Sequence, residues 1–86
     1  MLTNNVKKFR VEAEISQRDL SYIAGVTRQT MSLIEKGEYN PTISLCLRIC
    51  YGLNKTLDEV FWLKQGDFEN EKSRWWTFKD TINQKF

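Results

Sequence analysis

Residues 16–36, SQRDLSYIAGVTRQTMSLIEK, decide the fold of this chain. They predict two short helices joined by a tight turn at Gly25 and Val26. Ser16 and Thr27 suit the positions just before each helix, because their hydroxyls can accept hydrogen bonds from the free amides of the first turn. Gly25 ends the first helix, since glycine adopts the left-handed conformation at little cost. In a protein of 86 residues the second helix keeps one face with no core to bury, so that face is available to enter a groove.

The apolar residues of this stretch have the spacing of two helices that cross at a steep angle. Ser21 is small enough for the point where the two backbones approach most closely, and Gly25 tolerates the turn. Ile23 adds to the apolar stripe of the first helix. The positions that must face the other helix or the core are filled by Leu20, Ala24, Val26, Met31 and Ile34. The pattern predicts a helix-turn-helix unit, and the alternative is a hairpin that only fills the core.

Three further helices are predicted around this pair from their periodicity and their first residues. A helix over about residues 5–14 turns three apolar side chains inward: Val6, Phe9 and either Val11 or Ala13. Thr42 begins another helix, whose inner face repeats at i, i+3, i+4 and i+7 with Cys46, Ile49, Cys50 and Leu53. Thr56 begins a short fifth helix, which runs from Leu57 to about Phe61.

The composition excludes several classes of function. Thirteen basic and eleven acidic residues give a net charge of +2, and the chain holds no histidine. It lacks the commonest general base and the commonest metal ligand, so we expect no enzyme, no cofactor and no metal site. Cys46 and Cys50 would need two further ligands to hold zinc, and we expect them to be small buried hydrophobes. No small-molecule ligand is evident from the sequence.

The sequence gives no sign of a targeting segment or a membrane span. No apolar run approaches the roughly 18 residues that cross a bilayer. Lys7, Lys8 and Arg10 interrupt any apolar stretch that a secretory signal would need near the N-terminus. We therefore expect a cytoplasmic protein with no membrane partner.

The sequence resembles the phage repressor and Cro family of helix-turn-helix regulators, also called Xre-like, and in particular its short single-domain bacterial members. The resemblance rests on residues 16–20, 25–30, 34–37 and 39–41, and it covers about residues 4–62. Ser21 departs from the family pattern, because alanine is usual at that close contact. The resemblance implies an all-α, five-helix, repressor-like DNA-binding domain over residues 1–62. In such proteins the third helix lies in the major groove, and dimers contact half-sites one helical turn apart.

Helical spacing separates the inward and outward faces of residues 28–36. Met31 and Ile34 point inward, so the candidates for reading base edges are Arg28, Gln29, Ser32 and Leu33. Gln29 suits adenine because its amide can donate and accept together, whereas Arg28 suits guanine or a phosphate. Leu33 can contact a thymine methyl group.

Phosphate contacts are expected around the start of the second helix, where free amides and the helix dipole favour an anion. The resemblance implies that Gln17 holds the DNA backbone there and braces the start of the third helix near Gln29. For Asn40, the alternative to a phosphate contact is that its side chain only stabilises its own turn. The candidates, which would set register without reading sequence, are Ser16, Gln17, Arg18, Thr27, Lys36, Tyr39 and Asn40. The resemblance also implies a structural ion pair between Arg10 and Glu35, which holds the recognition helix against the core.

Residues 63–86 form a C-terminal extension past the family core and are rich in large aromatic side chains. Residues 70–84 suit an amphipathic helix, and residues 74–79 alternatively suit a strand. The extension either completes the monomer core or joins the fifth helix in a homodimer interface. The interface candidates are Phe61, Trp62, Trp75, Trp76, Phe78 and Ile82. Alternatively, Phe61–Lys64 forms a short strand that pairs with Met1–Thr3.

These observations together predict a sequence-specific, double-stranded-DNA-binding transcriptional regulator. The family resemblance implies a repressor that binds a palindromic operator as a homodimer. The alternative is an antitoxin-like interaction module, whose C-terminal tail binds a partner protein while the helix-turn-helix regulates its own promoter.

Overall fold

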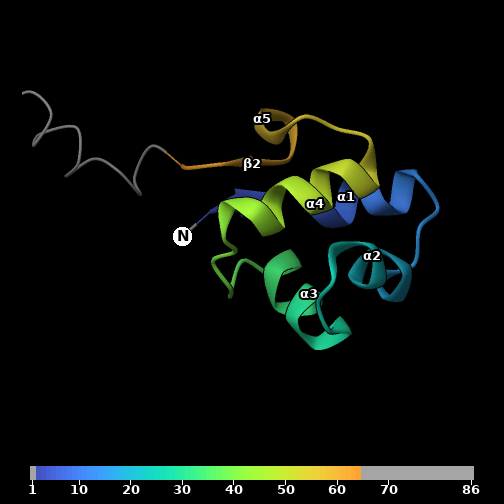
Figure 1. The fold of residues 1–86 in the computed structure, drawn as a ribbon. Coiled ribbons are helices and arrows are strands. Elements are labelled where there is room, and N and C mark those ends of the chain that lie inside the picture. The colour runs from blue at the N-terminus through green and yellow to red at the C-terminus, as the bar shows by residue number, and fades with distance from the viewer. Residues whose placement is uncertain (1, 65–86) are drawn as a thin grey trace, which may run out of the picture.

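The computed structural model describes residues 2–64 and contains five helices and a two-stranded sheet (Figure 1). In chain order the elements are β1 (Thr3–Asn4), α1 (Val6–Glu12), α2 (Gln17–Ala24), α3 (Arg28–Glu35), α4 (Ile43–Leu53), α5 (Leu57–Val60) and β2 (Phe61–Trp62). The predicted helical class is therefore confirmed, with a small sheet added. No helix among residues 2–64 is long and apolar enough to cross a membrane.

The two helices of the helix-turn-helix pair begin and end where the sequence predicts, whereas α1 is shorter than the predicted residues 5–14. The hydroxyl of Ser16 accepts a hydrogen bond from the amide of Asp19 at 2.9 Å, and that of Thr27 accepts one from the amide of Thr30 at 3.0 Å. Gly25 closes α2 in the left-handed conformation, with a φ of 73°. These local bonds satisfy amides that no intrahelical carbonyl can reach, so they fix the two helices of the pair.

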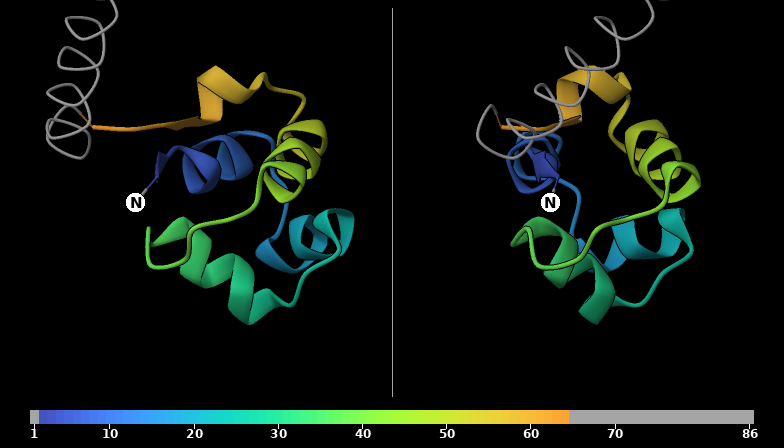
Figure 2. Two further views of the ribbon diagram at one scale, coloured as in Figure 1. Left: turned by 60° about the vertical axis from the view of Figure 1, so that its left-hand side comes forward. Right: turned by 90° about the vertical axis from the view of Figure 1, so that its left-hand side faces the viewer.

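The core lies between two layers of helices. Figure 2 shows α1 and α4 on one side and the α2–α3 pair on the other in both views. The largest fully buried side chains come from all of these helices and from α5: Val6, Leu20, Met31, Ile34, Cys46, Ile49 and Val60. Both predicted faces of the helix-turn-helix therefore meet a common core.

Two small residues let α2 pack closely in this core. A Cβ added at Gly52 would lie 3.0 Å from side-chain atoms of both Leu20 and Ile23, so glycine allows α4 to approach α2. Ser21 is 3% exposed, and its hydroxyl donates a hydrogen bond to the carbonyl of Gln17 at 2.6 Å. The hydroxyl that replaces the usual alanine is thus satisfied within its own helix.

The two strands tie the ends of the domain together. β1 and β2 pair antiparallel, with Thr3 opposite Trp62 and Asn4 opposite Phe61. Pairing between these terminal segments is therefore confirmed, but the strands are shorter than predicted and the first is shifted along the chain. The side-chain amide of Asn4 donates a hydrogen bond to the carbonyl of Ile34 at 2.8 Å, which fastens the strand to the end of α3.

Several sequence expectations need correction. Val11 is 58% exposed and Ala13, just past the end of α1, is also exposed, because α1 turns Val6 and Phe9 toward the core and leaves its other face in solvent. Ile23 is 43% exposed, since it lies at the edge of the contact between α2 and α4. The fifth helix ends at Val60, and the next residue, Phe61, is only 6% exposed. Phe61 is thus part of the monomer core and is withdrawn from the proposed dimer interface.

The predictions for the C-terminal extension lie outside the described residues. These are the helix over 70–84, the alternative strand over 74–79, and the interface candidates Trp75, Trp76, Phe78 and Ile82.

Candidate nucleic-acid interface

The outer side of α3 is open. Arg28 and Gln29 are exposed, Ser32 and Leu33 are half-buried, and Met31 and Ile34 have no exposed surface. The helix therefore presents the base-reading candidates on one side and its core residues on the other. Thr27 precedes it as the capping residue, so the N-terminal end of the helix is also at the surface.

A hollow follows this outer side of α3. It has a volume of about 450 Å³ and is lined by Gln17, Arg28, Gln29, Ser32, Leu33 and Lys36. A second hollow of about 510 Å³ shares some of these residues and extends toward α1, with lining residues Lys7, Arg10, Ser16, Gln17, Arg28, Ser32, Glu35 and Lys36. The two hollows bring the base-reading candidates together with the phosphate candidates Ser16, Gln17 and Lys36.

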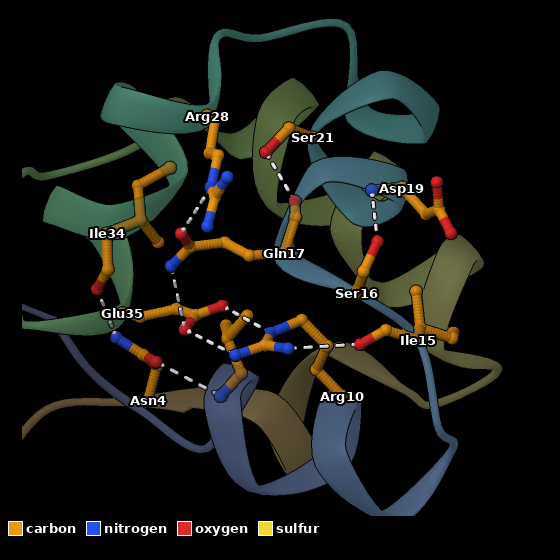
Figure 3. A network of polar contacts seen from close by, with 11 residues as sticks. Asn4, Arg10, Ile15, Ser16, Gln17, Asp19, Ser21, Arg28, Ile34 and Glu35 are labelled. Carbon is orange, nitrogen blue, oxygen red and sulfur yellow. Dashed lines mark hydrogen bonds and ion pairs between the residues drawn. The ribbon is translucent and has the colours of Figure 1, made fainter.

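An ion pair between two lining residues of the second hollow, Arg10 and Glu35, fastens α3 to α1 (Figure 3). The Nε of Arg10 donates to Oε2 of Glu35 at 2.8 Å, and its Nη2 donates to Oε1 at 3.2 Å. The Nη1 of Arg10 donates to the carbonyl of Ile15 at 3.0 Å. The side chains of Arg10 and Glu35 are 13% and 4% exposed, so the pair is largely withdrawn from water. The position of α3 relative to α1 is thus set by a desolvated charge pair.

Gln17 lies between this ion pair and the outer side of α3. Its Nε2 donates to Oε1 of Glu35 at 3.3 Å, and its Oε1 accepts from Nε of Arg28 at 3.4 Å (Figure 3). Gln17 therefore braces the start of α3. Its partner there is Arg28, whereas the resemblance implied a position near Gln29. Gln29 follows Arg28 in the helix and is exposed, so its amide is directed to the surface.

The remaining phosphate candidates are spread more widely. Arg18 is exposed on α2 but lines neither hollow. Tyr39 and Asn40 lie beyond the end of α3, where Tyr39 is 42% exposed. The side chain of Asn40 accepts a hydrogen bond from the amide of Leu2 at 3.3 Å. Asn40 therefore binds the N-terminal segment, whereas the sequence suggested a contact within its own turn as the alternative to a phosphate contact.

Lys7 is a residue of this surface that sequence reasoning missed. It is exposed and lines the larger hollow together with Arg28 and Lys36. Lys7 precedes Arg10 by three residues in α1, and residues three apart share a helix face. The expected pairing of Arg10 with α3 was therefore the signal that Lys7 faces the same way.

The two cysteines lie outside this surface. Cys46 and Cys50 are free thiols with exposed fractions of 2% and 4%. Burial raises the pKa of both thiols from the ordinary value, and both side chains act as packing residues in the core. Within residues 2–64, no cluster of three or more His, Cys, Asp or Glu side chains is arranged to hold a metal ion.

Comparison with known proteins identifies the family. The helix-turn-helix family model matches residues 6–60, which include all five helices. The chain therefore belongs to the helix-turn-helix family of the Cro and repressor type. This is a family of transcriptional regulators and not an enzyme family.

Relatives from bacteria and archaea share most of the described domain. The chain is 42% identical over 64 residues to YgzD of Bacillus subtilis (strain 168), an uncharacterized HTH-type transcriptional regulator, and the match covers 74% of this chain and 97% of that protein. It is 33% identical over 60 residues to MJ0272 of Methanocaldococcus jannaschii, also an uncharacterized HTH-type transcriptional regulator, covering 70% of this chain and 91% of that one.

Solved structures share the fold. The restriction-modification controller protein C.AhdI from Aeromonas hydrophila superposes with a TM-score of 0.61 at 22% identity, covering 64% of this chain and 83% of that chain. The hypothetical transcription factor NHTF from Neisseria gives a TM-score of 0.60 at 25% identity, covering 64% of this chain and 62% of that chain. The described domain is thus that of a transcriptional regulator with a helix-turn-helix DNA-binding fold.

Proposed function

We propose that this protein is a sequence-specific repressor that places α3 in the major groove of its operator. The observation that carries the proposal is the outer side of α3, where Arg28 and Gln29 are exposed above a core-facing side that is fully buried. Arg28 and Gln29, with Ser32 and Leu33, supply the donors, acceptors and apolar contact that base edges in the major groove require. Repression follows from occupation of the operator, which excludes polymerase from the same DNA.

The flanking polar residues bind the DNA backbone in this proposal. Ser16 and Gln17 stand at the start of α2, where amides and the helix dipole attract a phosphate. Thr27, Lys36, Arg18, Tyr39 and Asn40 contact further phosphates, and we add Lys7 because it lines the same hollow as Lys36. Binding therefore depends steeply on salt concentration, since each contact releases a condensed counterion.

The protein acts as a homodimer on a palindromic site in this proposal. Two copies contact two half-sites at once, which raises the affinity of a small domain without new base contacts. Trp62 and Leu63 are 38% and 44% exposed at the end of the described chain, which leaves apolar surface there for a second copy. The rest of the proposed interface, Trp75, Trp76, Phe78 and Ile82, belongs to the C-terminal extension.

Selection of bound sequences from random duplex DNA tests the proposal as a whole. We expect a palindromic product whose half-sites lie about one helical turn apart. Sedimentation of the full chain at micromolar concentration should give a dimer. Selected DNA without a consensus would contradict sequence-specific binding, and an asymmetric consensus with a monomeric protein would contradict the dimer.

Gln29→Ala and Ile34→Ala separate base reading from folding. Gln29 is exposed, so its substitution should leave the protein folded and relax the preference for one base pair by about 1–3 kcal/mol. Ile34 has no exposed surface, so its substitution should cost about 2–5 kcal/mol of stability through lost packing. If selection with Gln29→Ala returned the original consensus, the assignment of this side of α3 to base reading would be wrong.

A further inference from the structure

We infer that an exposed apolar groove between α2 and α4 binds the C-terminal extension of a second copy of the chain. The inference rests on the proposed homodimer and deepens it, because it names the surface that the extension contacts. The groove, called the α2–α4 groove below, has a volume of about 470 Å³ and is lined by Ile23, Ile43, Ser44, Leu47, Arg48 and Tyr51.

The apolar side chains of the α2–α4 groove form a stripe along α4. Ile43, Leu47 and Tyr51 follow one another at intervals of four residues, so they lie on one face of the helix. They are 64%, 52% and 85% exposed, and the exposed side chain of Ile23 lines the same groove from α2. Single apolar residues on a surface are normal, whereas a contiguous apolar patch marks a site of contact. The stripe is therefore a candidate binding surface.

Direct contact between the stripes of two copies is unfavourable. In a two-fold dimer, a residue at the axis meets its own counterpart. Arg48 lines the α2–α4 groove midway along the stripe, so this arrangement would bring two guanidinium groups together in an apolar contact. The groove therefore suits another segment of the chain better than a copy of itself.

The C-terminal extension has the apolar side chains that the α2–α4 groove requires. In the sequence they recur at spacings of three, four and four residues, which is typical of an amphipathic helix that binds in a groove: Trp75, Phe78, Ile82 and Phe86. α4 has 11 residues and is about 16 Å long, and residues 75–86 would span about 18 Å as a helix. The segment and the stripe therefore match in length as well as in chemistry.

The α2–α4 groove also supplies the apolar area that a stable dimer needs. Specific interfaces bury about 1,200–2,000 Å² in total. The exposed apolar side chains at the end of the described chain, Trp62 and Leu63, are too few to reach this area. A large aromatic side chain buries about 150–250 Å², so the three aromatic anchors of residues 75–86 bury roughly 900–1,500 Å² over two symmetric contacts, before the groove itself is counted. Two such contacts therefore reach the size of a specific interface.

The extension of a second copy is better placed for this contact than the extension of the same copy. β2 ends the described chain on the side of the domain away from α2 in Figure 1 and in both views of Figure 2. The extension therefore leaves its own domain away from Ile23, which lines the groove from α2. Exchange of the two extensions gives two identical contacts, so the dimer is closed and neither groove stays open.

Leu47→Glu and Val11→Glu test the groove in the full chain. Both residues are exposed apolar residues of helices, but Leu47 lines the α2–α4 groove, whereas Val11 lies on α1 outside it. Leu47→Glu should raise the dissociation constant of the dimer by about tenfold or more, because it places a carboxylate in an apolar contact. Val11→Glu makes the same change in charge and should leave the constant unchanged.

Sedimentation equilibrium measures both constants, and thermal unfolding reports whether each variant is folded. A dimer that Leu47→Glu leaves as tight as that of the unmodified protein would overturn the inference, and so would equal weakening by the two variants. Tyr51→Glu keeps the test decisive if Leu47→Glu fails to fold, because Tyr51 lines the same groove and is almost fully exposed. It should weaken the dimer in the same way.

A mixture of two variants shows whether the contact runs between copies. Leu47→Glu changes the groove and keeps the extension, whereas Ile82→Glu changes the extension and keeps the groove. Each variant alone should be largely monomeric, and the mixture should give a heterodimer joined by one unmodified contact. A mixture that stays monomeric at high micromolar concentration would overturn the inference and indicate that the extension binds its own domain. An Ile82→Glu protein that dimerises like the unmodified chain would overturn it as well, because the domains would then pair without the extension.

Failure of the proposed homodimer gives a different result. In that case the unmodified full chain sediments as a monomer, and the proposed function loses its dimer before any variant is compared. A dimer of the unmodified chain that persists in Leu47→Glu overturns only the assignment of the groove.

Discussion

The guanidinium of Arg10 in α1 and the carboxylate of Glu35 in α3 form a paired contact, with distances of 2.8 Å from Nε and 3.2 Å from Nη2. Their side chains are 13% and 4% exposed, and both residues line the larger of the two hollows beside α3. It is the direct polar link between the first helix and the recognition helix. The orientation of the outer side of α3 therefore depends on it.

Replacement of one member of the Arg10–Glu35 ion pair should lower the stability of the fold more than replacement of both. Arg10→Met leaves the charge of Glu35 buried with Gln17 as its one hydrogen-bond partner among residues 2–64, so we expect a loss of about 3–5 kcal/mol in the free energy of unfolding. The double variant Arg10→Met with Glu35→Met leaves no stranded charge and should recover most of that loss. Urea unfolding of the unmodified protein, of the single variants Arg10→Met and Glu35→Met, and of the double variant measures this. A double variant as unstable as the sum of the single variants would show that the packing around the pair matters and the charge does not.

The turn of the helix-turn-helix should tolerate asparagine better than alanine. Gly25 has a φ of 73°, and a Cβ added there would meet no atom within 4 Å, so the cost of substitution comes from the backbone alone. Gly25→Ala should therefore cost about 1–2 kcal/mol. Gly25→Asn should cost less, because asparagine enters the left-handed region more readily and already does so at Asn54, which ends α4 with a φ of 56°. Equal urea midpoints for the two variants would contradict this reason.

Acid should weaken the start of α5. The backbone amide of Thr56 donates a hydrogen bond to Glu59 and, with the Thr56 side chain, holds the pKa of that carboxyl below 4.5. A folded-state pKa below the unfolded value gives stability that is present above the unfolded pKa and is lost as pH falls through the folded one. Glu59→Gln should therefore lose less stability than the unmodified protein between about pH 6 and about pH 3. Urea midpoints across this range measure the difference, and parallel curves for the two proteins would contradict the assignment.

The helix-turn-helix itself was predictable because its signals are local. Ser16, Gly25 and Thr27 act on their own helix ends, so their roles follow from neighbours in the sequence. Exposure of Val11 and Ile23 was not predictable in the same way, since an apolar residue is buried only if another helix covers it. Where α1 and α2 meet α4 depends on close contacts such as that at Gly52, which a single sequence does not display.

The partner of Gln17 shows the same limit within the candidate site. The family resemblance implied that Gln17 braces the start of α3 near Gln29, and the structure shows its contact with Arg28. The choice depends on the carboxylate of Glu35, which fixes the amide nitrogen of Gln17 and so presents the amide oxygen to a donor. Arg28 is the stronger donor because it is charged. This selection needs α2 and α3 in their folded positions.

Lys7 and its neighbour Lys8 provide a matched test of the proposed surface. Both are exposed lysines of α1, but Lys7 lines the hollow beside Lys36, whereas the ammonium of Lys8 lies 5.8 Å from the ring centroid of Phe9. Lys7→Ala should weaken binding to all operators alike and reduce the slope of log K against log salt concentration by about 0.9, the value for one lost phosphate contact. Lys8→Ala removes the same charge from the chain and should leave the slope nearly unchanged. Titrations at several salt concentrations measure both slopes, and equal changes for the two variants would mean that only net charge matters and that Lys7 touches no phosphate.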